Sequence, residues 1–363
     1  MPFSVHIDSG RMWGGGQAQS LGLALALAER GERVHFLAQS GGALAERLAA
    51  TGLSWEAIPL RGLAGALRSA QLRARFRQLG PDIVHLHDSA ARVPAMWAAG
   101  RLGGEFIGGR PRVVATRRTD FPIAKPKRAR SYKFLCDRVI CVSEAARQRL
   151  LEAGAPANLL CVIPDFVDCQ LFDPAAVTME RKEHPTVVSV GRLTSEKGHI
   201  VLLRAMARVM VDVPGARLVI CGEGDQEGVL KKESETLGIA RAVSFVGFTA
   251  DVRPVLAAAD VFAMPSLSEG LGVAALEAMA MAKPVVASSV GGLRESVADG
   301  VTGLLVPSGD HLALAAAVTA LLEKPELAQT LGQAGRERVL AQFDRGPIID
   351  RVLAVYRDVL AED

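Results

Sequence analysis

The apolar positions of this chain follow two alternating patterns. Short apolar or β-branched runs, typical of buried strands, are separated by longer segments in which apolar residues recur at helical spacing. In the first half, predicted strands cover residues 3–7, 34–38, 55–58, 83–86, 113–116, 139–142 and 160–163, and predicted helices include residues 18–30 and 63–79. This βαβ rhythm predicts one parallel sheet with helices on its faces.

A second series begins after a break in the periodicity. Residues 164–185 lose the pattern and collect Pro, Asp and charged residues, so we place a linker there. Beyond it, predicted strands cover residues 186–190, 217–221, 243–246, 261–264, 285–287 and 304–306, with helices such as 200–210 and 272–281 between them. The sequence therefore predicts an α/β protein with Rossmann-like domains at residues 1–168 and 175–345, facing a central cleft at the carboxyl ends of their strands.

Composition supports this class and narrows the cellular setting. The 363 residues are 49% hydrophobic and only 5% aromatic, with 36 glycines, which suits α/β layers better than a β-sandwich. The five cysteines form no C-x-x-C pair and have no histidine at zinc spacing, so we interpret them as buried thiols. No signal peptide precedes the first predicted strand, and charged residues interrupt every apolar run short of the ~20 residues of a membrane span. We expect a cytoplasmic protein, attached to a membrane at most peripherally.

Charge is distributed unevenly. Residues 1–170 carry 23 Lys and Arg against 14 Asp and Glu, whereas residues 171–363 carry 19 against 25. Residues 110–133 alone hold nine cations and a single acid, Asp120, just after a first-domain strand. Two interpretations stay open: solvated helix faces, or contact with an anionic acceptor or lipid head groups. We predict acceptor contacts for Arg117 and Arg118, and no nucleic-acid partner, because no nucleic-acid-binding module accompanies this segment.

Two features of the first domain indicate a ligand site. Gly14, Gly15 and Gly16 separate the first strand from a helix, so their backbone N–H groups could face a phosphate, although a tight turn needs glycine too. Strand 83–86 ends in polar residues, and His87 falls at the rim where open α/β sheets bind ligands. A structural, hydrogen-bonded histidine is the alternative.

Two motifs of the second domain carry the charges that a nucleotide needs. Arg192 and Lys197 lie in the loop after strand 186–190, where both cations could converge on one diphosphate, with a solvated basic loop as the alternative. Glu269 and Glu277 flank a turn and the start of a helix, which places Glu277 among Ala and Leu. A carboxylate there suits ribose hydroxyls, and the amides of residues 270–273 suit phosphate, although Glu277 could instead bond to backbone.

Together these motifs resemble glycosyltransferase family 4, the group 1 retaining enzymes of the GT-B fold. The resemblance covers nearly the whole chain. It rests on the glycine turn at 14–16, D-I-V-H-L-H-D at 82–88, V-I-C-V-S-E-A at 139–145, I-P-D-F-V-D at 163–168, G-R-L-T-S-E-K-G at 191–198 and E-G-L-G-V-A-A-L-E-A at 269–278.

The resemblance implies a role for each of these residues. Glu277 would bind the donor ribose, Glu269 the hydroxyls of the transferred sugar, Arg192 and Lys197 the pyrophosphate, and His87 a sugar hydroxyl beside the reacting carbon. The implied catalytic residues are His87, Arg192, Lys197 and Glu269. The implied donor-binding residues are Gly14, Gly15, Gly16, Arg192, Lys197, Gly247, Phe248, Glu269, Gly270, Leu271, Gly272, Val273 and Glu277.

Other expectations follow from the same resemblance. Gly247 and Phe248 would lie near the donor base, although aromatic core packing explains Phe248 equally well. A helix at residues 346–363 would cross back to the first domain. The chain departs from the family pattern at Asp165-Phe166, where Asn-Gly is common, and at Gln17, where Glu is common.

We therefore expect a retaining glycosyltransferase that needs no cofactor and no metal, since no D-x-D motif occurs in a loop position. The donor would be a nucleotide-sugar, UDP-linked or alternatively GDP-linked. The acceptor would be a cell-envelope glycan or a lipid-linked sugar such as lipopolysaccharide core. A nucleotide-sugar epimerase or phosphorylase, or a non-catalytic sugar-nucleotide-binding module, remains the alternative. An NAD-dependent dehydrogenase is disfavoured because neither first βα turn reads G-x-G-x-x-G with an acid at the expected distance.

Overall fold

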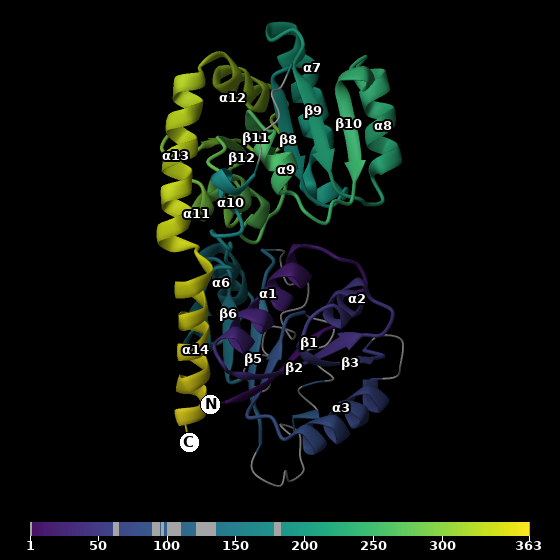
Figure 1. The fold of residues 1–363 in the computed structure, drawn as a ribbon, viewed down its shortest axis with the longest axis vertical. Helices are drawn as coiled ribbons and strands as arrows, with labels where there is room; N and C mark the ends of the chain where they lie inside the picture. Colours follow the sequence, from purple (N-terminus) through teal and green to yellow (C-terminus); the bar gives the residue numbers. More distant parts are fainter. Residues whose placement is uncertain are drawn as a thin grey trace. The chain divides into compact units, whose positions relative to one another are not determined.

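The computed structural model describes residues 2–60, 65–88, 95, 98–99, 110–120, 136–177 and 183–362. The chain divides into two compact units (Figure 1), which are treated separately below: unit 1 consists of residues 1–165 and 346–363, and unit 2 of residues 166–345. Part of the predicted basic segment, residues 121–133, lies outside the described residues.

Unit 1 is built on a seven-stranded parallel sheet with strand order β3-β2-β1-β4-β5-β6-β7. Its elements are β1 (Phe3–Asp8), α1 (Gly15–Glu29), β2 (Arg33–Gln39), α2 (Ala43–Ala49), β3 (Ser54–Ile58), α3 (Gly65–Leu79), β4 (Ile83–Leu86), β5 (Arg112–Arg117), β6 (Arg138–Cys141), α6 (Glu144–Glu152), the 3-10 turn η1 (Ala157–Leu159), β7 (Leu160–Val162) and α14 (Arg345–Ala361). All residues of β1 and β4 are buried, as expected for central parallel strands covered on both faces.

The C-terminal helix α14 is anchored to this sheet. Tyr356 is almost fully buried, and its hydroxyl lies 2.6 Å from Nδ1 of His85 on β4. Arg30, at the end of α1, pairs with Asp350 of the same helix. These contacts join residues far apart in sequence and make α14 part of unit 1.

Unit 2 is built on a six-stranded parallel sheet with strand order β10-β9-β8-β11-β12-β13 (Figure 1). Its elements are η2 (Pro174–Ala176), β8 (Thr186–Val190), η3 (Ser195–Lys197), α7 (His199–Asp212), β9 (Arg217–Cys221), α8 (Glu227–Thr236), η4 (Ala240–Ala242), β10 (Val243–Gly247), α9 (Arg253–Ala257), β11 (Val261–Met264), α10 (Val273–Ala280), β12 (Val285–Ser288), α11 (Leu293–Ser296), β13 (Leu304–Val306), α12 (His311–Glu323) and α13 (Pro325–Gln342).

The predicted fold class is confirmed: each unit holds one parallel sheet with helices. Strands β4, β8, β9, β11 and β13 have the predicted bounds, because each is a mostly apolar run followed by a histidine, glycine or proline. In the described part of the chain, no helix is both long and apolar enough to span a membrane.

Candidate functional site

Each sheet has one place where the strand order reverses, between β1 and β4 in unit 1 and between β8 and β11 in unit 2. Ligands of open α/β sheets bind beyond the carboxyl ends of the strands at this switch point. The glycine turn follows β1 and His87 follows β4, whereas Lys197 and Glu269 lie in the loops after β8 and β11. The sequence motifs thus fall at the two switch points.

In unit 2 the structure brings Lys197 and Glu269 together. Lys197 Nζ lies 2.5 Å from Oε2 of Glu269, and both side chains are largely buried. Gly198 makes this approach possible: it has a φ of 67°, and a Cβ there would lie 2.1 Å from the carbonyl oxygen of Pro265. Only glycine fits this contact between the two loops, which sets the distance between the cation and the carboxylate.

The turn before α10 presents a row of backbone donors. Gly272 is the N-cap of α10 with a φ of 92°, and no side chain caps the helix. Within the described backbone and side chains, the N–H groups of residues 270–273 donate to no acceptor. Uncapped N–H groups at a helix N-terminus attract anions, so this turn is suited to phosphate oxygens.

Glu277 lies one turn into α10 and is only partly exposed. Burial raises the pKa of its carboxyl group to about 7. No hydrogen bond to this carboxyl group occurs among the described residues, so the alternative in which it bonds to backbone is not observed. A carboxylate in this setting gains most from a ligand that donates hydroxyl protons.

Arg192 is held more loosely. Its side chain is 52% exposed, and Nη2 lies 3.4 Å from Oε1 of Glu196. Sequence analysis gave Glu196 no role, although the 191–198 run shows that it lies four residues after Arg192. Exposed pairs of this kind contribute little, so an anion can replace Glu196 at small cost.

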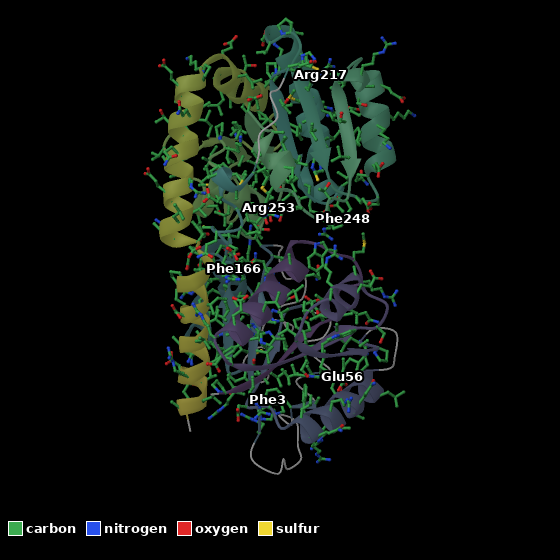
Figure 2. All side chains as sticks on the ribbon, viewed as in Figure 1. Phe3, Glu56, Phe166, Arg217, Phe248 and Arg253 are labelled. Carbon is green, nitrogen blue, oxygen red and sulfur yellow. The ribbon has the colours of Figure 1, made fainter. Side chains whose placement is uncertain are left out.

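Gly247 and Phe248 lie at the carboxyl end of β10, and Figure 2 shows Phe248 at the opposite end of this sheet from Arg217, where β9 begins. Phe248 is 43% exposed, so it is not simply a core residue. Its backbone N–H donates to Oε1 of Glu223 at 3.2 Å. Glu223 was missed from the sequence, since only the packing of adjacent strand ends brings it to this position.

In unit 1 the glycine turn opens α1. The helix begins at Gly15 with no side-chain cap, and the N–H groups of residues 15–17 donate to no acceptor among the residues that the structure describes. A Cβ at Gly15 would meet nothing within 4 Å, whereas one at Gly16 would lie 4.0 Å from Cδ of Arg118. Gly15 therefore faces open space, and Arg118 lies beside the turn.

The replacement at Gln17 has a structural reason. Its Nε2 donates to Oδ1 of Asp8 at 3.2 Å, and Ser20 Oγ donates to the other oxygen at 3.0 Å. Burial and then the charge of Asp88 raise the pKa of Asp8. A glutamate at position 17 would add a third carboxylate to this group, so Gln17 fits where an acid would be repelled.

His87 lies in a buried stack of three histidines. Its ring is 4.3 Å from that of His85 and 5.1 Å from that of His6. His87 Nε2 lies 2.9 Å from Nδ1 of His6, and His85 Nε2 lies 2.7 Å from Oγ1 of Thr116. The predicted rim histidine is thus embedded in the unit and largely buried.

This stack is neutral. Burial lowers the pKa of His6 to about 3 and lowers the pKa values of His85 and His87 well below their ordinary range, and the charge of Arg118 adds to the effect in each case. The three rings form the one group of potential metal ligands in the described chain. The His6–His87 hydrogen bond would have to break before the three ring nitrogens could bind one ion.

Arg118 has an acidic partner. Its Nε donates to Oδ1 of Asp165 at 2.9 Å, and its Nη1 lies 3.3 Å from Nδ1 of His87. The two members of the ion pair are 12% and 9% exposed. Arg117 is the last residue of β5 and half-buried. An acceptor anion at Arg118 would therefore have to compete with Asp165, which belongs to one of the two departures from the family pattern.

Comparison with known proteins covers both units. Residues 13–171 match the family described as Glycosyltransferase Family 4, and residues 175–338 match Glycosyl transferases group 1. The chain is 40% identical over 223 residues to the GDP-mannose-dependent alpha-(1-6)-phosphatidylinositol monomannoside mannosyltransferase of Mycobacterium tuberculosis, covering 57% of this chain and 58% of that protein. It is 31% identical over 307 residues to the glycogen synthase of the same organism, covering 80% of this chain and 74% of that protein.

The aligned region spans less than two thirds of the length of several such relatives. Among solved structures, HepE from Anabaena in complex with UDP and glucose superimposes with a TM-score of 0.85 at 22% identity, covering 98% of this chain and 99% of that one. This likeness shows a shared fold.

Proposed function

This chain belongs to the group 1 glycosyltransferases of family 4, and on that premise we propose that it transfers a sugar from a nucleotide-sugar to a hydroxyl group of an acceptor. The observation that carries the proposal is the Lys197–Glu269 pair beside the uncapped amides of residues 270–273. A cation, a carboxylate and a row of N–H donors meet at one switch point, where they match a diphosphate and the hydroxyls of an attached sugar.

We propose that unit 2 holds the donor. Glu277 accepts hydrogen bonds from the ribose hydroxyls, and Glu269 accepts them from the transferred sugar. Lys197 is freed from Glu269 to meet the diphosphate, which Arg192 also reaches once it leaves Glu196. The exposed ring of Phe248 gives the base an apolar surface.

The proposed reaction retains the configuration at the anomeric carbon. The bond from that carbon to the departing phosphate oxygen breaks, and the acceptor oxygen bonds to the same face of the carbon. The acceptor's proton passes to the departing phosphate oxygen, so no side chain has to form a covalent intermediate. Lys197, Arg192 and the amides stabilise the charge on the departing diphosphate without a metal ion.

The proposal also names the donor base and the acceptor. A UDP-sugar comes first and a GDP-sugar second; a 40% identical relative is named as GDP-mannose-dependent, and a structural neighbour was solved with UDP. The acceptor is a cell-envelope glycan or a lipid-linked sugar such as lipopolysaccharide core, reached at a membrane surface. The excess of Lys and Arg in residues 1–170 and the phosphatidylinositol-linked acceptor in that relative's name support this class.

The test is a screen of UDP-, GDP- and ADP-sugars with EDTA present, read by thermal shift and by release of the nucleoside diphosphate. One donor class should stabilise the protein and be hydrolysed slowly. Glu277→Ala should lose both responses, whereas Glu326→Ala, which removes an exposed glutamate of α13, should keep them.

Other outcomes would replace the proposal. Release that depends on added Mg²⁺ or Mn²⁺ would contradict metal independence. Conversion of the sugar without release of diphosphate would indicate an epimerase. Binding with no turnover, even when glycan acceptors are added, would indicate a non-catalytic binding module.

A further inference from the structure

We infer that Arg118, clamped by Asp165, is a positioning residue that fixes His87 as the Nε2–H tautomer and aligns a chain of hydrogen bonds through His6 to Ser4. The chain itself stands on the geometry of unit 1. Its bearing on turnover rests on the proposed function, with His87 beside the reacting carbon as the family resemblance implies.

The direction of the chain follows from the donor at one end. A guanidinium group has only donors, so Nδ1 of His87 must accept the bond from Nη1 of Arg118 at 3.3 Å. The neutral His87 ring then carries its proton on Nε2 and donates to Nδ1 of His6 at 2.9 Å. His6 in turn carries its proton on Nε2 and donates to Oγ of Ser4 at 3.2 Å.

Burial makes this arrangement specific. His6 and His87 are 0% and 6% exposed, and the Arg118–Asp165 pair is nearly as buried, so water does not compete for these bonds. Asp165 also holds the guanidinium through Nε, which leaves Nη1 aimed at the histidine. The reversed tautomer of His87 would set an N–H against a guanidinium N–H.

The same geometry limits what His87 can do. Both of its ring nitrogens already have partners inside unit 1. Arg118 also lies against the glycine turn, with its Cδ 4.0 Å from where a Cβ of Gly16 would be. A single side chain therefore sets both the ring of His87 and one wall of the turn before α1.

Asp165 thus has a structural role, which is to pair with Arg118. A neutral residue there would leave the charge of Arg118 without its buried partner. We therefore connect Asp165 of the I-P-D-F-V-D run to the positioning of a residue 47 positions earlier in the chain.

The test is nitrogen-15 NMR of the histidine rings, in which two-bond couplings from the carbon-bound ring protons distinguish the tautomers. His87→Gln assigns the signals. The wild type should show Nε2–H for His87 and His6. In Arg118→Met the Nε2–H preference of His87 should be lost, and Arg147→Met, which removes the surface partner of Glu144, should leave the spectrum unchanged.

Because Arg118→Met leaves a buried carboxylate, Arg118→Met combined with Asp165→Asn repeats the test without that charge. An Nδ1–H tautomer of His87 in the wild type, or unchanged His87 signals in both variants, would overturn the inference. These spectra need no substrate, so they decide it even if no donor is turned over.

Once a donor is known, the double variant should lower kcat by about tenfold or more, since small displacements near a reacting centre have effects of this size. The KM for the nucleotide-sugar should stay within about twofold, and Arg118→Lys should restore part of kcat because it keeps a donor for Nδ1. An unchanged kcat alongside an altered tautomer would overturn the positioning role.

Discussion

The two switch points differ in how far their polar side chains are already hydrogen-bonded within the chain. In unit 1 the polar groups around His87 bond to one another, and their ion pair is almost completely buried. In unit 2 the amides of residues 270–273 and the carboxyl group of Glu277 have no partner in the described chain, and the pair made by Arg192 is exposed. A saturated site keeps its geometry, whereas an unsaturated one gains free energy when a ligand supplies the missing partners. At the glycine turn of unit 1 the amides of residues 15–17 also lack an acceptor among the described residues, so the contrast lies in the side chains, and it supports the proposal that unit 2 holds the charged donor.

The largest expected effect on stability comes from removing the buried Arg118–Asp165 ion pair of unit 1. Arg118→Met should lower the free energy of unfolding by about 4 kcal/mol, because it leaves the carboxyl group of Asp165, whose pKa burial already raises, without its buried cation. Arg147→Met removes an exposed pair and should cost about 0.5 kcal/mol or less. Urea denaturation of both variants measures the difference. Equal losses would show that the Arg118–Asp165 pair is solvated.

Lys197 should matter for the reaction and also for stability, because its removal leaves the largely buried carboxyl group of Glu269 without its cation. Lys197→Ala should lower kcat/KM by roughly 10²-fold, on the order of 3 kcal/mol, because it removes charge stabilisation from the departing diphosphate. Lys324→Ala, at an exposed position before α13, is the matched control. Steady-state rates of diphosphate release provide the measurement, and a loss of less than about threefold would remove Lys197 from the proposed site.

Glu277 should make unit 2 less stable as the pH rises. Its pKa is about 7 in the folded protein against an ordinary value of 4.5, so the folded state binds the proton more tightly and loses stability between these two pH values. At pH 8 the free energy of unfolding of Glu277→Gln should therefore be about 2 kcal/mol higher than that of the wild type, a figure reduced for the partial exposure of Glu277. At pH 4 the two should differ very little. Denaturation at both pH values checks this. A gain of the same size at pH 4 would mean that charge is not the cause.

The smallest expected effect is at the exposed pair of unit 2. Glu196→Gln should change the free energy of unfolding by less than about 0.5 kcal/mol while tightening diphosphate binding slightly, since Arg192 no longer has to leave a carboxylate. Calorimetric titration gives the binding constant. Weaker binding in this variant would show that Glu196 orients Arg192 for the ligand.

The sequence predicted features that depend on neighbouring residues better than contacts between residues far apart in the chain. Strands such as β8 and β11 were predicted to the residue, because a parallel strand buried on both faces is a continuous apolar run. Glycine-containing turns after those strands also pointed to the switch points, since the chain order places them there.

The partners within the sites could not be predicted in the same way. Tyr356 meets His85 across 271 positions, and Arg118 meets His87 across 31. Such pairs depend on strand register and on the docking of α14, neither of which is encoded in a local pattern. The sequence therefore suggested a ligand contact for the ring of His87, whereas the folded chain uses both ring nitrogens internally.

Calorimetric titration of UDP and GDP at pH 7 with EDTA, in two buffers of different ionisation enthalpy, tests the central claim that unit 2 binds the donor through unsatisfied groups. Ribose hydroxyls that donate to Glu277 favour its ionised form, so one of the two nucleotides should bind with release of part of a proton. Glu277→Gln should bind it more weakly and release none. No binding of either nucleotide, or the same proton release in the variant, would contradict the account.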